Sequence, residues 1–160
     1  MKTTRAFLVL FSFLFIASCG EPPPPPPPKA VDLAAAKLIS DQIADDLLND
    51  NVDDIYKHLD VGFQLIVKDA KDVKKNLDGM YVEPGHPTNF EFKISKISTR
   101  KDGSWVRPCR NFWYAVQTKK YKKGKYFLKV EIVPSIGGGP LDVSGFGILS
   151  FKNQVPSDLQ

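Results

Sequence analysis

The stretch NFWYAVQTKKYKKGKYFLKVEIV, residues 111–133, decides the fold class of this 160-residue chain. On both sides of its lysine-rich middle, apolar residues recur at every second position, which is typical of β-strands with one buried face. Lys123-Gly124 supplies a turn, and so short a connection joins antiparallel strands. The positions expected on one face are Phe112, Tyr114, Val116 and Thr118 in the first run, and Tyr126, Leu128, Val130 and Ile132 in the second.

The same period extends to both neighbours of this hairpin. Upstream, apolar and polar residues alternate from Phe90 to Ser95, and Asp102-Gly103 predicts a turn before the next strand. Downstream, residues 143–151 predict a last strand, whose glycines at 145 and 147 allow a bend. The sequence therefore predicts an antiparallel sheet of about four strands.

Before the sheet, apolar residues recur at helical spacing. Three helices are expected, each preceded by a residue that can cap its first turn: Asp32, then Asp50 or Asn51, then Asp69. Between the second and the third, Phe63–Val67 is an apolar run too short to show a period, and we expect a strand or a segment inserted into the core. The fold class is therefore α+β, with three N-terminal helices packed on a curved antiparallel sheet.

The order of these elements resembles that of a known family. A long helix, the Asn49-Asp50-Asn51 break and the short helix Ile55–Leu59 make Ala35–Phe63 similar to the opening of NTF2-like (cystatin-like α+β roll) domains. The third helix and the sheet keep the same order, so the resemblance spans residues 30–155 and implies a cone-shaped domain over residues 30–160. The family includes isomerases, dehydratases, protein-docking modules and lipoproteins, so the fold does not choose an activity.

Residues 1–20 resemble a bacterial lipoprotein signal. Lys2 and Arg5 precede an apolar segment, and Ile16-Ala17-Ser18-Cys19-Gly20 closes it with two small residues and a cysteine. The segment is too short for a spanning helix, which needs roughly 20 apolar residues. The resemblance implies removal of residues 1–18 as a signal peptide and acyl chains such as palmitate on Cys19. The exported protein is then anchored to a bacterial membrane, and Gly20 favours the outer over the inner membrane. The alternative is an ordinary signal peptide cut near Ser18.

Residues 19–29 contain the acceptor cysteine and a polyproline linker. The seven prolines Pro22–Pro28 lack amide donors and have fixed φ, so we expect a polyproline II segment. Such a segment is roughly 22 Å long and would hold the folded domain off the lipid surface. The alternative is a proline-rich ligand for an aromatic groove of another protein.

Charge and cysteine content narrow the class of partner. The chain has 22 Lys+Arg and 18 Asp+Glu, and without Lys2 and Arg5 the balance is 20 against 18, a net charge near +2. A net charge of this size is too small for a typical nucleic-acid-binding protein, so we expect no nucleic acid as a partner. If Cys19 carries lipid, Cys109 has no partner within the chain, and we expect a small buried residue on a strand.

No set of residues identifies a catalytic centre. Asp60, near the end of the second helix, is the carboxylate to test first, with Tyr56 and His58 beside it. An apolar pocket raises the pKa of a carboxyl group and can make it a proton shuttle. Capping is the simpler role for Asp60.

Two clusters are candidate binding surfaces. Trp105, Arg107, Arg110 and Trp113 are the best candidate, because Arg and Trp are enriched at interface hot spots; core packing of the tryptophans is the alternative. The lysines around Tyr121 form a basic hairpin tip, which is either a solvated turn or a contact for anionic polymers or headgroups.

Metal sites and cofactors are not expected. Asp50, Asp53 and Asp54 are close in sequence, but the glycine and the terminal glutamate of an EF-hand loop are missing at their positions. Cysteines and histidines do not occur at the spacing of a zinc site.

The sequence therefore favours a lipid-anchored envelope module, not an enzyme, that binds an envelope protein or a small apolar ligand through its cone or its sheet. The alternative is a small NTF2-like enzyme, of the isomerase or dehydratase type, that uses proton transfer in the cone. A mostly apolar cavity with a carboxylate and a facing tyrosine would favour the enzyme. A filled cone with an exposed aromatic and arginine patch would favour the docking module.

Overall fold

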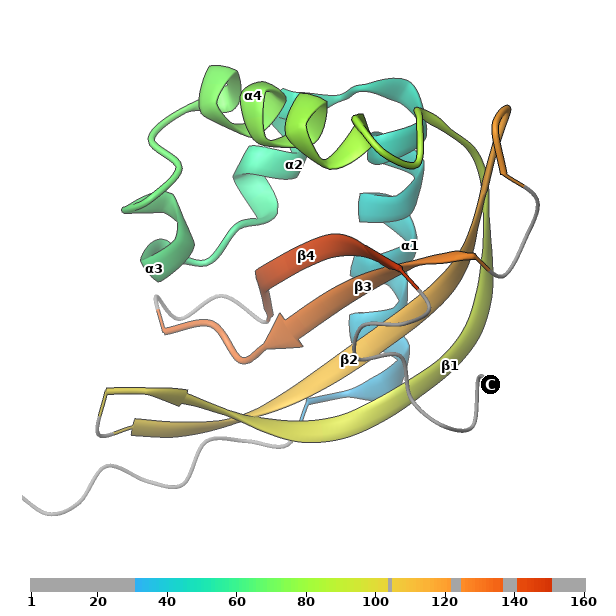
Figure 1. Cartoon of the computed structure of the whole chain (residues 1–160). Helices are drawn as coiled ribbons and strands as arrows, with labels where there is room; N and C mark the ends of the chain where they lie inside the picture. The colour runs from blue at the N-terminus through green and yellow to red at the C-terminus, as the bar shows by residue number, and fades with distance from the viewer. Residues whose placement is uncertain (1–30, 104, 122–124, 137–140, 151–160) are drawn as a thin grey trace, which may run out of the picture.

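The computed structural model describes residues 31–103, 105–121, 125–136 and 141–150 of the chain (Figure 1). It confirms an α+β fold in which helices precede a four-stranded antiparallel sheet. The elements are α1 (Leu33–Asn49), α2 (Val52–His58), α3 (Val61–Gln64), α4 (Ala70–Tyr81), β1 (Pro87–Asp102), β2 (Trp105–Thr118), β3 (Tyr126–Val133) and β4 (Asp142–Ser150). The predicted signal peptide, Cys19, the proline linker and the last ten residues lie outside the described residues.

The sheet has the order β1-β2-β3-β4, and each strand pairs with the next along the chain. The predicted turn at Asp102-Gly103 is present, and Gly103 has a φ of +62°, which favours glycine. The helices lie on one side of the sheet, with α1 running along it and α2 between α1 and α4 (Figure 1). β1 and β4 are therefore the two edges of the sheet.

The core lies between the helices and the predicted inward face of the sheet. Ile43 and Leu47 of α1 are fully buried there against Phe112 and Leu128. Burial of one such side chain stabilises the fold by about 1.5–3 kcal/mol. The space between helices and sheet is thus filled by side chains rather than left as a deep cone.

Trp113, Ala115 and Phe127 form a second buried cluster, against which Ile94 and Leu149 pack. They alternate along the strands with the inward residues, so they belong to the opposite face of the sheet. No helix among the described elements lies on that face (Figure 1).

Two of the predicted caps are formed by side chains. Asp32 Oδ1 accepts a hydrogen bond from the Ala35 amide at 2.7 Å, and Asp69 Oδ1 accepts one from the Asp72 amide at 3.0 Å. Asn51 occupies the cap position of α2 but makes no capping bond with its side chain. These caps satisfy amide groups that a helix leaves unpaired in its first turn.

For Phe63–Val67 the predicted strand was wrong, and with it the number of helices, whereas the alternative of a segment inserted into the core is confirmed for Phe63 and Val67. The segment contains the end of the short helix α3 followed by a turn, so the described chain has four helical segments and not three. Leu65 and Ile66 are exposed, and within the segment only Val67 is buried. The reason is local: Asp60 Oδ1 accepts a hydrogen bond from the Phe63 amide at 2.7 Å and starts a helical turn that an apolar run alone does not indicate.

No helix in the described part of the chain is long and apolar enough to cross a membrane.

Candidate binding groove along strand β4

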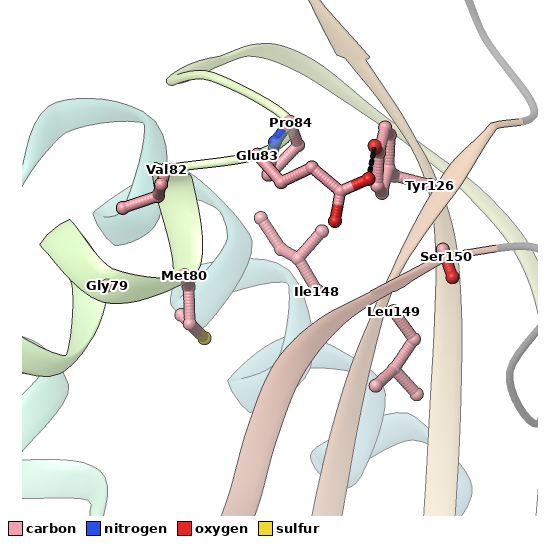
Figure 2. A pocket seen from close by; sticks show the side chains of 9 residues that line it. All are labelled: Gly79, Met80, Val82, Glu83, Pro84, Tyr126, Ile148, Leu149 and Ser150. Atoms are coloured by element: carbon pink, nitrogen blue, oxygen red, sulfur yellow. Dashed lines mark hydrogen bonds between the residues drawn. The ribbon is translucent and has the colours of Figure 1, made fainter.

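Two hollows adjoin the helix-facing side of β4. One has a volume of ≈ 340 Å³ and lies between β4, α4 and the chain around α3. The other, of ≈ 450 Å³, lies between the end of α4, the loop that follows it and the ends of β3 and β4 (Figure 2). Met80 lines both, so we treat them as one feature, the β4 groove. Its walls include Leu59, Phe63, Ile66, Val67, Val73, Asn76, Met80, Pro84, Phe146 and Ile148.

The apolar lining follows from the register of β4. Phe146 pairs with Val130 and Ile148 pairs with Leu128, and side chains directly opposite each other point to the same face of a sheet. Val130 and Leu128 are fully buried beneath the helices, whereas Phe146 and Ile148 are only partly buried. At the edge of the sheet, the helices therefore leave two large inward side chains in contact with the solvent.

Further apolar side chains lie at the mouth of the groove. Ile66 lines it and is 76% exposed, and its neighbour Leu65 is 77% exposed. Val82, in the loop after α4, is 81% exposed and lines the other half. Exposed apolar side chains at the rim of a groove are a feature of interaction sites.

The outer edge of β4 is chemically unlike the other edge of the sheet. From Val143 to Ser150 the strand has no charged residue, whereas β1 has lysines at 93, 96 and 101 and an arginine at 100. Charged side chains on an edge strand discourage pairing with a further strand. Near the start of β4, the Asp60 amide donates to the Val143 carbonyl at 2.9 Å. Beyond Val143, no strand among the described residues pairs with this edge.

A polar pair stands at one end of the groove. Tyr126 Oη donates a hydrogen bond to Glu83 Oε1 at 2.7 Å (Figure 2). This bond, together with burial, raises the pKa of Tyr126 to about 12, so the phenol remains a donor at neutral pH. Tyr126 is buried, but Glu83 is exposed, so water reaches the carboxylate freely.

Both carboxylate oxygens of Asp60 accept hydrogen bonds from other parts of the protein. Its side chain is 2% exposed, and its second oxygen, Oδ2, accepts a hydrogen bond from Arg107 Nη2 at 2.9 Å. With Oδ1 bound to the Phe63 amide, both oxygens have donors. The carboxylate therefore joins β2 to the start of α3 and is already engaged on both sides.

Tyr56 and His58 do not converge with Asp60 on a shared cavity. Tyr56 Oη donates to the Lys68 carbonyl at 2.8 Å, and its ring lines a separate hollow between α2 and α4. His58, in the last turn of α2, is half-buried and lines neither half of the β4 groove. The three candidate catalytic residues therefore do not line one common cavity.

The four candidate binding residues do not form one patch. Arg110 pairs with Ile132 across the sheet, whereas Trp113 lies three positions further along the strand and belongs to the other face, where it is buried. Arg107 is turned to Asp60 and also donates to the Pro134 carbonyl at 3.4 Å. Trp105 is the first residue of β2, and its side chain lies outside what the structure describes.

Cys109 is a buried free thiol. Its sulfur lies 2.9 Å from Ser98 Oγ on the neighbouring strand. Burial raises the pKa of the Cys109 thiol, which keeps it protonated and unreactive.

The described residues hold no group of three or more histidine, cysteine, aspartate or glutamate side chains that could bind a metal ion. Sequence reasoning missed the groove itself, because Met80, Phe146 and Ile148 have the spacing of ordinary core residues. The uncharged run in the last strand was the one available signal, since an edge strand normally contains charge.

Comparisons with known proteins add no relative to this description. No protein-family model matches the chain, and no curated protein or solved structure matches it.

Proposed function

We propose that this protein is an exported lipoprotein of a bacterial envelope and that its folded domain is a docking module. Residues 1–18 are removed as a signal, Cys19 carries the lipid, and the prolines up to Pro28 space the domain from the membrane. Support comes from the joint occurrence of a basic start, an apolar segment, two small residues and a cysteine, followed directly by a stiff spacer. The outer membrane is the proposed location.

We propose further that the domain is NTF2-like. A long first helix, a break at Asp50 with a φ of +54°, and a short second helix precede the antiparallel sheet, in the order that the resemblance requires. The helices gather on one side of that sheet (Figure 1).

The β4 groove is the proposed docking site, and its occupant is an extended, uncharged segment of a partner protein. The observation that carries this is the edge of β4 beyond Val143, which is uncharged, has no partner strand among the described residues and lies beside a groove with apolar walls. A peptide that adds to such an edge gains main-chain hydrogen bonds, and every second side chain enters the groove. The exposed Ile66 and Val82 would be covered by the same segment.

A proton-transfer enzyme is the second candidate, and Glu83 with Tyr126 is the observation in its favour. The pair places a carboxylate and a facing phenol beside Met80 and Ile148 (Figure 2). However, Glu83 is exposed, whereas sites for proton transfer gain their strength by excluding water. A small molecule that co-purifies with the protein in contact with Glu83 would favour this alternative.

Photo-crosslinking in cells tests the docking site. The photoreactive residue is placed at Ser150, the last residue of β4, which lines the groove and pairs with the inward-facing Tyr126. We expect a discrete protein adduct, and we expect Ile66→Ser to abolish it because the mouth of the groove loses its apolar contact. Ile97→Ser is the matched control, because Ile97 is 73% exposed on β1, far from the groove in sheet order. An adduct that survives Ile66→Ser, or that both serine variants lose equally, would rule the groove out as the docking site. Failure to form any adduct would do the same.

A further inference from the structure

A second feature of the molecule, next to the Glu83 and Tyr126 end of the β4 groove, is a group of lysines between β2 and β3. Residues 119–125 contain five lysines, of which Lys119, Lys120 and Lys125 are described by the structure. None of these three ammonium groups pairs with a carboxylate of the described chain. Lys120 Nζ instead donates to the Glu83 carbonyl at 3.3 Å, and Lys125 Nζ lies 3.6 Å from the centroid of the Tyr121 ring.

Next to these lysines lies a hollow of ≈ 240 Å³ between the loop after α4 and the end of β2. Gly85, His86, Thr88, Lys119 and Lys120 line it. Gly85 has a φ of +80°, which favours glycine and fixes the course of the loop. Thr88 Oγ1 donates to the Gln117 carbonyl at 3.1 Å and ties the loop to β2. The hollow thus has a fixed base and two cationic side chains at its rim.

The acidic groups near this surface already have donors. Glu83 accepts the hydrogen bond of Tyr126, as described above. Asp50 Oδ2 lies 3.3 Å from His86 Nε2, and Asp50 Oδ1 lies 3.8 Å from Lys74 Nζ. Neither carboxylate forms an ion pair with Lys119, Lys120 or Lys125 in the described part of the chain, so these three charges are available to an external anion.

The position of this surface relative to the linker favours one source of anion. The linker joins the domain just before α1, whereas His86 contacts Asp50 at the opposite end of α1. A helix of 17 residues is roughly 25 Å long, so the lysines lie at the far end of the molecule from the attachment point (Figure 1). A domain anchored through the linker presents them away from the lipid surface.

We propose that Lys119, Lys120 and Lys125, with the hollow beside them, bind a polyanion in the layer above the membrane. That such a layer faces this end of the molecule rests on the proposed anchoring; the binding itself does not. Three lysines that lie near one another attract a polymer with many charges more strongly than a single anion, because neighbouring charges of the polymer engage neighbouring lysines. Tyr121, between Lys120 and Lys125, holds both ammonium groups over its ring, at 5.1 and 3.6 Å from its centroid.

The test uses the full chain, purified in a non-ionic detergent, and fluorescent poly-L-glutamate as the probe, with binding measured by anisotropy. We expect the triple variant Lys119→Gln/Lys120→Gln/Lys125→Gln to bind about 100-fold more weakly, since each lysine near a polyanionic surface contributes a factor of about five. The matched control is Lys68→Gln/Lys71→Gln/Lys75→Gln, which removes the same charge from exposed lysines in and before α4. It should bind like the unaltered protein.

Three outcomes would overturn the proposal: no binding by the unaltered chain, an equal loss in both triple variants, or displacement of the polymer by mixed micelles containing phosphatidylglycerol. The last result would identify lipid headgroups as the anion. Because the measurement does not depend on the lipid at Cys19, its failure is distinguishable from failure of the proposed anchoring.

Discussion

At the scale of single residues, the ion pair between Asp60 and Arg107 is the contact on which the chain around the groove depends. The Asp60 side chain is 2% exposed and that of Arg107 is 10% exposed, so neither charge is well solvated. A buried pair of this kind adds little net stability compared with apolar residues, but removing one partner leaves the other charge buried and uncompensated. Asp60 is also the N-cap of α3, and Ile66, two residues after the end of this helix, lines the groove.

We therefore predict that Asp60→Ala lowers the free energy of unfolding by about 3–5 kcal/mol, as measured by denaturant titration. Asp60→Asn should cost less, because its amide oxygen can still accept the hydrogen bond of the Phe63 amide. The double variant Asp60→Ala/Arg107→Met should be more stable than the sum of the two single changes predicts, since it leaves no unpaired charge. Additive effects, or a loss below about 1 kcal/mol for Asp60→Ala, would contradict this role.

At the scale of elements, Glu131 of β3 joins three strands across the sheet. Its Oε1 accepts hydrogen bonds from Arg100 Nη1 of β1 at 3.1 Å and from Ser144 Oγ of β4 at 2.7 Å. Lys129 Nζ lies 3.3 Å from its Oε2. Burial opposes the charged form, but the Ser144 hydroxyl, Lys129 and Arg100 outweigh it, and the pKa of Glu131 is lowered.

This shift predicts a dependence of stability on pH. A carboxyl group whose pKa is lower in the folded state stabilises the fold above its ordinary value of 4.5 and loses that effect as the pH falls through the lowered pKa. At pH 7, Glu131→Gln should lower the free energy of unfolding by about 1–3 kcal/mol, and the difference from the unaltered protein should shrink below pH 4.5. Asp54→Asn is the control, because its pair with Lys57 is exposed and screened by solvent. A difference that stays constant from pH 7 to pH 3 would exclude an electrostatic role for Glu131.

The elements that the sequence predicts well are those in which period and cap agree. In α1, Asp32 caps the helix, and Ile43 and Leu47 of the predicted stripe are fully buried. α3 could not be predicted in the same way, because it spans four residues and depends on one hydrogen bond to Asp60. A period needs more residues than that to appear.

The candidate site was harder to predict, for two physical reasons. Phe146 and Ile148 follow the pattern of core residues, and only the position of β4 at the edge of the sheet leaves them partly open. Strand order is a tertiary property that alternation along one strand does not contain. In contrast, the prediction that Arg110 and Trp113 share one surface was wrong for a reason visible in the sequence, because residues three apart along a strand lie on opposite faces.

At the scale of the whole molecule, the basic surface adjoins one end of the groove, and the proposed anchor is attached at the other end of α1. The linker enters at the start of α1, the lysines lie near the far end of α1, and the groove lies along β4 at one edge of the sheet (Figure 1). Lys120 contacts Glu83 and Lys125 contacts Tyr126, and both of these residues line the groove, so a protein strand and a polyanion would be neighbours at that end of it. The orientation of the domain relative to the membrane depends on the proposed anchor, and therefore on Cys19.

We predict that Cys19→Ala releases the protein from the membrane fraction or leaves it as an uncut precursor, as judged by fractionation and by mass. A single acyl chain binds a bilayer only marginally, whereas two or three chains on one cysteine give stable attachment, so removal of their acceptor should have an all-or-none effect. Cys109→Ala is the matched control, because it removes the other cysteine, a buried free thiol with no lipid expected on it. If Cys19→Ala is still cut and still fractionates with membranes, the attachment depends on something other than lipid at this cysteine. The folded domain would then have to be tested as a membrane-binding surface in its own right, beginning with the exposed Leu65, Ile66 and Val82 beside the groove.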